Sequence, residues 1–449
     1  MAAPLAPDFA EAVLWQQQAA ADPGAAADPE RTAPGGRDLP DRADVIVVGA
    51  GYAGVSAARE LAAAGRDVLV LDAHPVGWGA STRNGGMVIP ELTSGPGALE
   101  RSLGPLGRRL YAEVNEAFDH VEELTAGSTP QIACDYQRTG QLYLAHAERL
   151  VPALQATARE HGDELGEAVR FVPRAELGAE VGSLAYHGGV VFERTGGLHP
   201  ARFHRGLVAG ARDAGARILG GARVRSIARR DGAAAGHRVA AEVGPGTIRE
   251  IDAGEVVVCT NAYADDAVPA LARRVLPVGS FIIATEVLDP ELARSVSPRG
   301  RMLVDTKNFL FYWRLTPDGR VVFGGRRSLA RSTLAQAREF LYASMVAVHP
   351  QLAGVAVARA WGGDVAVTLD RLPHVGRIDG AWYATGCNGS GVALNTWLGM
   401  RIGRHLVGDG PPPAFAELGH RPIPLHRWRR LFLPAVGLFY RWQDRGFRP

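Results

Sequence analysis

Three glycines near the N-terminus have the spacing of a nucleotide-binding turn. Gly49, Gly51 and Gly54 follow an apolar run, 45–48, and open a helix-like stretch, 55–64. The first glycine permits a tight turn, the second lets the backbone approach a pyrophosphate, and the third lets the helix pack on the strand. The helix N-terminus adds free N–H donors and partial positive charge, which favour an anion. The pattern therefore predicts a strand, turn and helix that hold a dinucleotide.

An acidic residue ends the next apolar run, 68–71. Asp72 can accept hydrogen bonds from a ribose and disfavours a 2′-phosphate, so NADP is the least expected cofactor while NAD and FAD stay open. A glycine-rich polar loop, 77–86, then takes the place of a third regular element. Its backbone N–H groups can line the diphosphate and ring system of an extended dinucleotide, which favours FAD.

A second strand, glycine turn and helix follow near the C-terminus. The apolar run 382–385 leads into Gly386, Gly389 and Gly391, and a helix is expected over 392–406. A helix N-terminus aimed at a reduced flavin would stabilise the negative charge that the ring gathers. This turn is therefore the second predicted contact with the cofactor.

Composition excludes several classes of protein. The 49 Lys and Arg against 47 Asp and Glu give a formal net charge of +2, which creates no field for nucleic acid. Three distant cysteines without a Cys-x-x-Cys pair argue against disulfides and against a metal site. No apolar run approaches the roughly 20 residues that span a bilayer, and the N-terminus has no signal-peptide pattern. A cytoplasmic protein without a transmembrane segment is expected.

Five blocks of the sequence carry a family likeness. They are the glycine turn with Asp72, Gly79 to Gly86, Gly197 to Pro200, 305–325 around Tyr312, and 361–391. Together they resemble the FAD-dependent D-amino acid oxidase superfamily, and most closely its gamma-glutamylputrescine oxidase-type amine oxidoreductases. The resemblance implies an α/β fold in which a Rossmann-like FAD-binding domain carries an inserted, mainly antiparallel α+β substrate domain.

The division of the chain follows from this likeness. Residues 1–43 are expected to be a partly disordered leader, with the folded chain starting at Asp44, and the tail 409–449 is expected to dock on the fold. The FAD-binding domain is expected from 44–100, 186–265 and 355–408, and the substrate domain from 101–185 and 266–354. The residues expected to contact the cofactor are Gly49, Gly51, Tyr52, Ala53, Gly54, Asp72, Ala73, Gly79, Ala80, Ser81, Arg83, Asn84, Gly85, Gly86, Val224, Thr260, Asn261, Trp361, Gly386, Asn388, Gly389, Ser390, Gly391 and Val392.

The expected catalytic residues lie on one strand, 309–315. Alternation places Tyr312 and Arg314 on one face and Trp313 on the other. Tyr312 matches the tyrosine that the family places over the flavin, and its ring and hydroxyl can hold an amine. Trp313 and Arg314 complete the predicted set, although core packing and an ion pair are the commoner uses of such residues.

Two cationic anchors of the wider family are missing. Relatives that oxidise alpha-amino acids carry an arginine soon after the Trp361-like position, and sarcosine oxidases carry a lysine just after the late glycine turn. Residues 362–368 and 391–394 contain neither, which favours an amine whose polar groups lie farther from the flavin. No cysteine precedes Thr368 in the stretch that some sarcosine oxidases link to flavin, so noncovalent FAD is expected.

The expected reaction is oxidation of the C–N bond of a primary or secondary amine. Hydride transfer to flavin N5 would give an imine that hydrolyses, and oxygen or another acceptor would take the electrons. One alternative is a D-amino acid or N-methyl amino acid oxidase or dehydrogenase anchored by Arg314 or Arg83. Another is a flavin-bearing, non-catalytic subunit of a larger assembly, which the basic aromatic tail 421–449 favours. The sequence specifies neither the substrate nor the oligomeric state.

Overall fold

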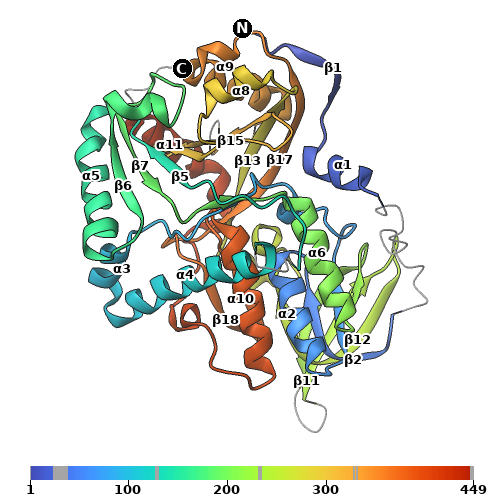
Figure 1. Cartoon of the computed structure of the whole chain (residues 1–449). Coiled ribbons are helices and arrows are strands. Elements are labelled where there is room, and N and C mark those ends of the chain that lie inside the picture. The colour runs from blue at the N-terminus through green and yellow to red at the C-terminus, as the bar shows by residue number, and fades with distance from the viewer. Residues whose placement is uncertain are drawn as a thin grey trace.

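The chain divides between two large β-sheets. The computed structural model describes residues 2–23, 39–126, 131–230, 235–326, 329 and 332–444. Within these residues the larger sheet has nine strands and the smaller has eight, and a short pair, β4 (Met87–Val88) and β8 (Gly196–Gly197), stands apart. Figure 1 shows the larger sheet in the upper half of the molecule and the smaller sheet in the lower half.

The smaller sheet contains the strand, turn and helix that the first glycine pattern predicts. Its strands, in spatial order, are β10 (Arg223–Arg230), β11 (Gly236–Glu242), β12 (Ile248–Val258), β2 (Arg42–Val48), β3 (Val68–Leu71) and β9 (Arg217–Leu219), with β19 (Ala381–Thr385) paired to β12 and β18 (His374–Ile378) to β19. β12, β2, β3 and β9 are parallel. Such strands are covered on both faces and therefore have continuous apolar runs, as in Val45 to Val48.

Helices enclose the smaller sheet and its core. α2 (Tyr52–Ala63) packs against α10 (Gly391–Leu406) and α6 (Pro200–Asp213), and α4 (Pro105–Thr125) packs against α10. Their buried faces, with Leu61, Phe118 and Trp397, form one continuous apolar cluster. The first turn of α2 and the first turn of α10 are thereby held in one rigid body.

The larger sheet is mainly antiparallel, as expected. Its strands, in spatial order, are β1 (Leu5–Ala10), β17 (Val357–Val367), β13 (Leu276–Thr285), β16 (Val321–Gly325), β15 (Phe311–Leu315), β14 (Met302–Asp305), β5 (Gln141–Leu144), β7 (Gly188–Phe192) and β6 (Val169–Pro173). Among the described strands of this larger sheet, only the pairs β1–β17 and β14–β5 are parallel. α9 (Leu334–Val348) and α8 (Pro290–Val296) bury their apolar side chains with those of this sheet. The remaining helices are α1 (Leu14–Ala21), α3 (Pro96–Leu103), α5 (Val151–Arg159), α7 (Pro269–Ala272) and α11 (Arg429–Gln443).

Three elements join a different part of the fold than expected. β7 and β17 fall inside the segments 186–265 and 355–408, which were assigned to the FAD-binding domain, yet both lie in the larger sheet. α4 falls inside 101–185, assigned to the substrate domain, yet it packs with the nucleotide-binding helices. Periodicity shows that a segment is a strand or a helix, but its pairing partners are distant in sequence and leave no local pattern.

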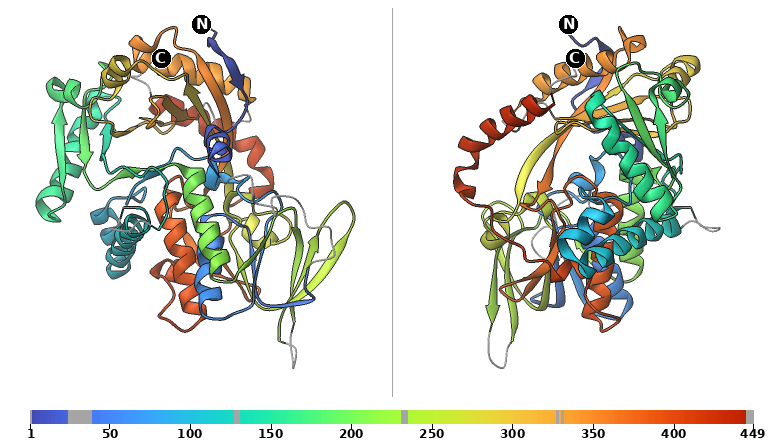
Figure 2. Two further views of the ribbon diagram at one scale, coloured as in Figure 1. Left: turned by 45° about the vertical axis from the view of Figure 1, so that its right-hand side comes forward. Right: turned by 90° about the vertical axis from the view of Figure 1, so that its left-hand side faces the viewer.

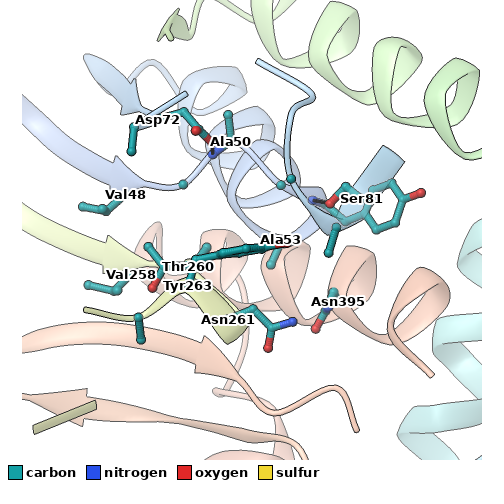
Figure 3. A pocket seen from close by; sticks show the side chains of 18 of the residues that line it. Val48, Ala50, Ala53, Asp72, Ser81, Val258, Thr260, Asn261, Tyr263 and Asn395 are labelled. Atoms are coloured by element: carbon teal, nitrogen blue, oxygen red, sulfur yellow. Dashed lines mark hydrogen bonds between the residues drawn. The ribbon is translucent and has the colours of Figure 1, made fainter. Parts of the chain in front are cut away.

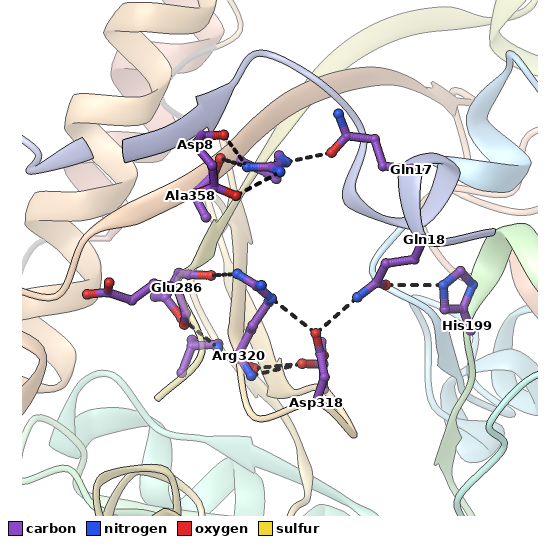
Figure 4. A network of polar contacts seen from close by, with 12 residues as sticks. Asp8, Gln17, Gln18, His199, Glu286, Asp318, Arg320 and Ala358 are labelled. Atoms are coloured by element: carbon purple, nitrogen blue, oxygen red, sulfur yellow. Dashed lines mark hydrogen bonds and ion pairs between the residues drawn. The ribbon is translucent and has the colours of Figure 1, made fainter. Parts of the chain in front are cut away.

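The N-terminal segment is also part of the fold, so a folded chain starting at Asp44 was wrong. β1 pairs with β17 and α1 packs on α6, burying Trp15. Polar contacts fix this segment: the guanidinium of Arg359 donates to Asp8 and Gln17. Gln18 donates to Asp318, as Figure 4 shows. Residues 24–38 of the expected leader lie outside the described residues.

Buried histidines predict a loss of stability in acid. His349 is fully buried, its Nδ1–H donates to Gly182 O at 3.0 Å, and burial lowers its pKa to about 4. An unfolded histidine has a pKa of about 6.5. The unfolded chain therefore takes up the proton first, and the free energy of unfolding falls between these two pH values by up to roughly 1.4 kcal/mol per pH unit. His349→Asn should show a smaller drop between pH 7 and pH 5 in urea unfolding, and an equal drop would contradict this cause.

Candidate active site

Steric constraints at the first glycine turn match the nucleotide-binding pattern. Gly49 has φ = 101°, and a Cβ there would lie 2.9 Å from the carbonyl oxygen of Cys259. A Cβ on Gly54 would overlap the carbonyl oxygen of Gly49. α2 begins at Tyr52, directly after this turn, with Gly51 as its N-cap. The turn thus brings the positive end of a helix to the carboxyl end of β2, where α/β folds bind ligands.

A cavity opens at this turn and reaches the first turn of α10. The predicted cofactor residues that line it are Gly49, Gly51, Tyr52, Ala53, Asp72, Ala73, Gly79, Ala80, Ser81, Asn84, Val224, Thr260, Asn261, Gly389, Gly391 and Val392. Figure 3 shows Asp72 beside Ala50, with Asn261 and Asn395 across the cavity. Segments separated by more than half of the chain therefore share one cavity.

Polar groups of the cavity wall suit a sugar and phosphate ligand. Asp72 accepts hydrogen bonds from the backbone N–H of Ala50 at 2.8 Å and of His74 at 3.0 Å, so it also fixes the turn. Thr260 Oγ1 is buried and has no hydrogen-bond partner among the described residues. A buried hydroxyl without a partner is costly, and a polar ligand in the cavity would satisfy it.

The loop 79–86 closes over the start of α2. Ser81 Oγ accepts from the backbone N–H of Tyr52 at 3.0 Å, and Asn84 Oδ1 accepts from Gly86 N at 2.8 Å. Gly85 and Gly86 do not line the cavity; a Cβ on Gly86 would overlap the carbonyl oxygen of Leu198. These two glycines instead let neighbouring segments approach the loop.

The second glycine turn is held by asparagines. Asn261 Oδ1 accepts from Gly386 N at 3.0 Å, and Asn388, at φ = 50°, accepts from Thr368 N at 3.1 Å. Gly386, Asn388 and Ser390, predicted as cofactor contacts, lie behind the cavity wall. The lining residues Tyr263, Cys387 and Asn395 were missed, because no sequence pattern marks a single wall residue.

Tyr312 lies against the loop 79–86 at Gly85, and it does not itself line the cavity. Its hydroxyl shares a 3.1 Å hydrogen bond with Ser280 Oγ, and burial raises the pKa of the phenol. Gly85 and Gly324 make room for the ring: a Cβ on Gly85 would lie 3.1 Å from Tyr312 Cε2, and one on Gly324 would overlap the ring. The tyrosine therefore stays protonated and able to donate, and its ring separates β16 from the loop.

Trp313 is not near the cavity, which corrects its predicted place in the catalytic set. It points to the opposite face of β15, is fully buried, and stacks on Tyr186 with ring centroids 6.0 Å apart. Its indole belongs to the core beneath α9. Strand alternation forces this placement once Tyr312 faces the loop.

Arg314 supports the loop instead of offering its charge to a ligand in the cavity. Its Nε donates to Gly85 O at 2.8 Å and its Nη2 to Leu198 O at 2.7 Å. Burial lowers its pKa to about 10, so it remains a cation at neutral pH. It lines a second cavity, with Trp15 and His199, outside the glycine-lined one. We assign Arg314 to positioning the loop.

Sequence reasoning missed one cation on the Tyr312 side of the sheet. Arg326 follows β16 directly, and two-residue alternation from Gly324 places it on the face that Tyr312 occupies. Burial lowers its pKa, and Tyr312, Cys387 and Arg371 are the ionisable side chains near enough to influence it. Its side chain makes no hydrogen bond or ion pair with another described residue. The alternation of 321–325 was the signal that could have identified it.

Comparison with known proteins decides the family. The profile of the DAO family, described as FAD dependent oxidoreductase, matches residues 44–404. The chain belongs to this family. It is an FAD-dependent oxidoreductase, as the glycine turns and the loop predicted.

Individual relatives agree with this assignment. The chain is 33% identical to gamma-glutamylputrescine oxidoreductase of Escherichia coli strain K12 over 88% of its own length and 91% of the relative. It is 26% identical to glycine oxidase of Pseudomonas aeruginosa over 78% and 91%. Glycine oxidase from Bacillus cereus shares the fold, with a TM-score of 0.68, 16% identity, and coverage of 86% of this chain and all of that one.

The residues of this oxidoreductase fit FAD. The two glycines that a Cβ would block, the start of α2 and the partnerless Thr260 hydroxyl all lie where a dinucleotide phosphate and ribose need them. α10 starts at the other side of the same cavity, so its N-terminus can face the electron-rich part of the flavin ring.

Two tryptophans of the oxidoreductase donate hydrogen bonds to the backbone of the loop 79–86. Trp15 Nε1 donates to Asn84 O at 2.9 Å, and Trp361 Nε1 donates to Arg83 O at 2.8 Å. Arg83 in turn donates to Gly362 O at 3.0 Å. Arg83 and Trp361, predicted to contact the cofactor, thus fix the loop backbone and do not line the cavity.

Trp15→Ala should weaken both the fold and flavin retention. Removing this buried ring costs about 3–5 kcal/mol, and the carbonyl of Asn84 loses its donor. We expect a lower midpoint in thermal unfolding and a smaller FAD content after dialysis. Trp15→Phe keeps an aromatic ring but not the N–H. Its thermal midpoint and its FAD content should lie between those of the wild type and those of Trp15→Ala. Unchanged FAD retention in Trp15→Ala would show that this contact with the loop does not matter.

Proposed function

We propose that this FAD-dependent oxidoreductase oxidises the carbon–nitrogen bond of a primary or secondary amine. Bound FAD would supply the hydride acceptor, at its N5 atom, and the oxidised substrate would be an imine that water hydrolyses. The observation that carries the proposal is Tyr312, whose protonated hydroxyl and ring stand beside the loop 79–86. The likeness to gamma-glutamylputrescine oxidoreductase, which is named for an amine, supports the same class of substrate.

The residues around Tyr312 act by position. Ser280 fixes the phenol hydroxyl, and the glycines on either side fix the ring, so that an amine can be held with one carbon–hydrogen bond facing the cofactor. Such orientation supplies much of the rate in reactions that need no acid or base at the reacting carbon. Trp15 and Trp361 pack behind the loop in one apolar cluster, which keeps water from that side.

Noncovalent attachment of FAD is part of the proposal. Cys259 lines the cavity, but burial raises the pKa of its thiol to about 12, so the thiolate needed for attack is scarce. Cys387 also lines the cavity and accepts a hydrogen bond from Asn261 Nδ2 at 3.3 Å. Acid precipitation should release all of the yellow colour into the supernatant, and colour that stays with the protein would contradict this point.

Anaerobic bleaching of the flavin tests the reaction. The purified protein is mixed without oxygen with a panel of primary and secondary amines, D-amino acids and N-methyl amino acids, and absorbance near the flavin maximum is followed. Amines should bleach the flavin faster than either class of amino acid. Preference for a small D-amino acid would overturn the substrate class. Admitting oxygen afterwards separates an oxidase, which regains its colour, from a dehydrogenase.

A further inference from the structure

Arg326 is a charge that the proposed reaction does not use. The groups that act on it are a phenol, a thiol and another arginine, and none of them is a carboxylate. A half-buried guanidinium without an anionic partner among the described residues is unfavourable, because it has lost water without gaining a counter-charge. An anionic group of a ligand would supply that charge.

The direction of the strand fixes where that anion would lie. Tyr312 pairs with Gly324, and Arg326 is two residues farther along the chain, so the two side chains start about 7 Å apart on the same face. An alpha-amino acid carries its amine and its carboxylate on one carbon. A substrate that reaches both residues therefore has several bonds between the two groups.

We propose that Arg326 binds the carboxylate of an amine substrate whose amine lies several bonds away, as in an omega-amino acid. The assignment rests on the proposed amine oxidation. The planar guanidinium can hold a carboxylate through two parallel hydrogen bonds while Tyr312 holds the amine end. It also explains how an enzyme without the two family anchors selects its substrate.

Matched pairs of substrates test the assignment. 4-Aminobutanoate, 5-aminopentanoate and 6-aminohexanoate are compared with their neutral amides by anaerobic flavin reduction. The loss of one charge-assisted contact corresponds to about 10- to 100-fold in kcat/KM. Arg326→Gln should lower kcat/KM for the acids by this factor, mainly through KM, and leave the amides unchanged. Arg294→Gln, an exposed arginine on α8, is the control and should behave as the wild type.

Binding without chemistry separates this proposal from the proposed function. Hexanoate has no amine, so its perturbation of the flavin spectrum reports the anion site alone. It should bind Arg326→Gln at least about 10-fold more weakly than the wild type. Equal losses for acids and amides, or hexanoate binding that ignores the substitution, would assign Arg326 to the flavin and overturn the proposal. Hexanoate binding that needs Arg326 in a protein that no amine bleaches would overturn the proposed function only.

A second, independent observation concerns α11. Leu431, Leu438, Phe439 and Trp442 are 72%, 65%, 52% and 57% exposed, and helical spacing places them on one side. The other side is attached to the fold, where Asp444 accepts from Phe309 N at 3.0 Å. Figure 2 shows α11 at the outer margin of the molecule in its right-hand view. α11 is thus attached to the fold through polar contacts on one side, and its other side exposes large apolar side chains to solvent.

The charge of the segment identifies what can cover this apolar face. Residues 421–449 contain seven arginines and one acidic residue, and Arg421 and Arg427 are exposed. Leucine, phenylalanine and tryptophan flanked by arginine are typical of helices that lie in the surface of an anionic membrane. No helix of the described residues is long and apolar enough to cross a bilayer. We infer that α11 attaches the enzyme peripherally to an anionic lipid surface.

Vesicle cosedimentation tests the lipid surface. The protein should sediment with vesicles of phosphatidylglycerol and phosphatidylcholine, and at least about 10-fold less with phosphatidylcholine alone or in 0.5 M salt. The double variant Leu438→Ser/Trp442→Ser should lose binding and keep its flavin. Leu184→Ser, which removes an isolated leucine that is 92% exposed, is the matched control. Failure to bind anionic vesicles, or a dimer that only the double variant dissociates, would overturn the inference.

Discussion

Gly54→Ala should yield a folded protein without yellow colour. A Cβ at this position would overlap the carbonyl oxygen of Gly49, so the start of α2 has to move away from the turn. The N–H contacts that the start of α2 would make to a phosphate, each worth about 1.5–3 kcal/mol, would then be lost. FAD affinity should fall by at least roughly 100-fold. The ratio of flavin absorbance to protein absorbance, measured after gel filtration, checks the result.

A glycine in open surroundings provides the control. Gly210 lies in α6, and a Cβ there would meet only the Arg59 side chain, at 3.8 Å. Gly210→Ala should keep full colour and gain slightly in stability, because alanine favours helices by about 1 kcal/mol over glycine. Equal FAD content in both variants would refute the steric role of Gly54.

Asp305→Ala should strongly destabilise the larger sheet. Asp305 is fully buried, forms an ion pair with Lys307, and accepts from Phe311 N at 3.0 Å. Removing one partner of such a pair leaves the other charge buried and costs about 3–5 kcal/mol. Urea unfolding at neutral pH should show the midpoint moving sharply to lower concentration.

A double variant separates the ion pair from packing. Asp305→Leu combined with Lys307→Met removes both charges and keeps apolar volume, so it should recover most of the stability that Asp305→Ala loses. Lys307→Met alone should be destabilised, because the buried carboxylate then loses its counter-charge and keeps only neutral donors, two backbone N–H groups and the Tyr186 hydroxyl. If the double variant unfolds at a lower urea concentration than both single variants, side-chain packing and not the buried charge determines the loss of stability.

The parts of the fold that local sequence predicts are those with local steric rules. At Gly49 and at Gly54 a neighbouring carbonyl oxygen excludes any side chain. Only glycine fits at these two positions, so the spacing of the glycines predicts the turn. The mainly antiparallel sheet was expected from the family likeness. The pairing of β1 with β17 was not predicted, because two strands far apart in sequence carry no pattern that identifies them as partners.

The candidate site divides in the same way. The loop 79–86 and both glycine turns were predicted as cofactor contacts, and most of their residues line the cavity. Trp313 was misplaced because a catalytic set was drawn from neighbours in sequence, whereas neighbours on a strand face opposite sides. Arg326 was overlooked because the family likeness directed attention to two other cationic positions. Its neighbours Tyr312 and Cys387 are distant in sequence and come near it only through tertiary structure.

The pairing of Leu5 with Val357 sets an order for biosynthesis. A ribosome makes chains from the N-terminus at about 5–20 residues per second, so the first strand waits for most of translation before its partner emerges. Trp15, which donates a hydrogen bond to Asn84 of the loop 79–86, reaches its final place only after this pairing has formed. Nascent protein should therefore acquire its cofactor late, and a bulky fusion placed ahead of Met1 should delay maturation more than one placed after Pro449.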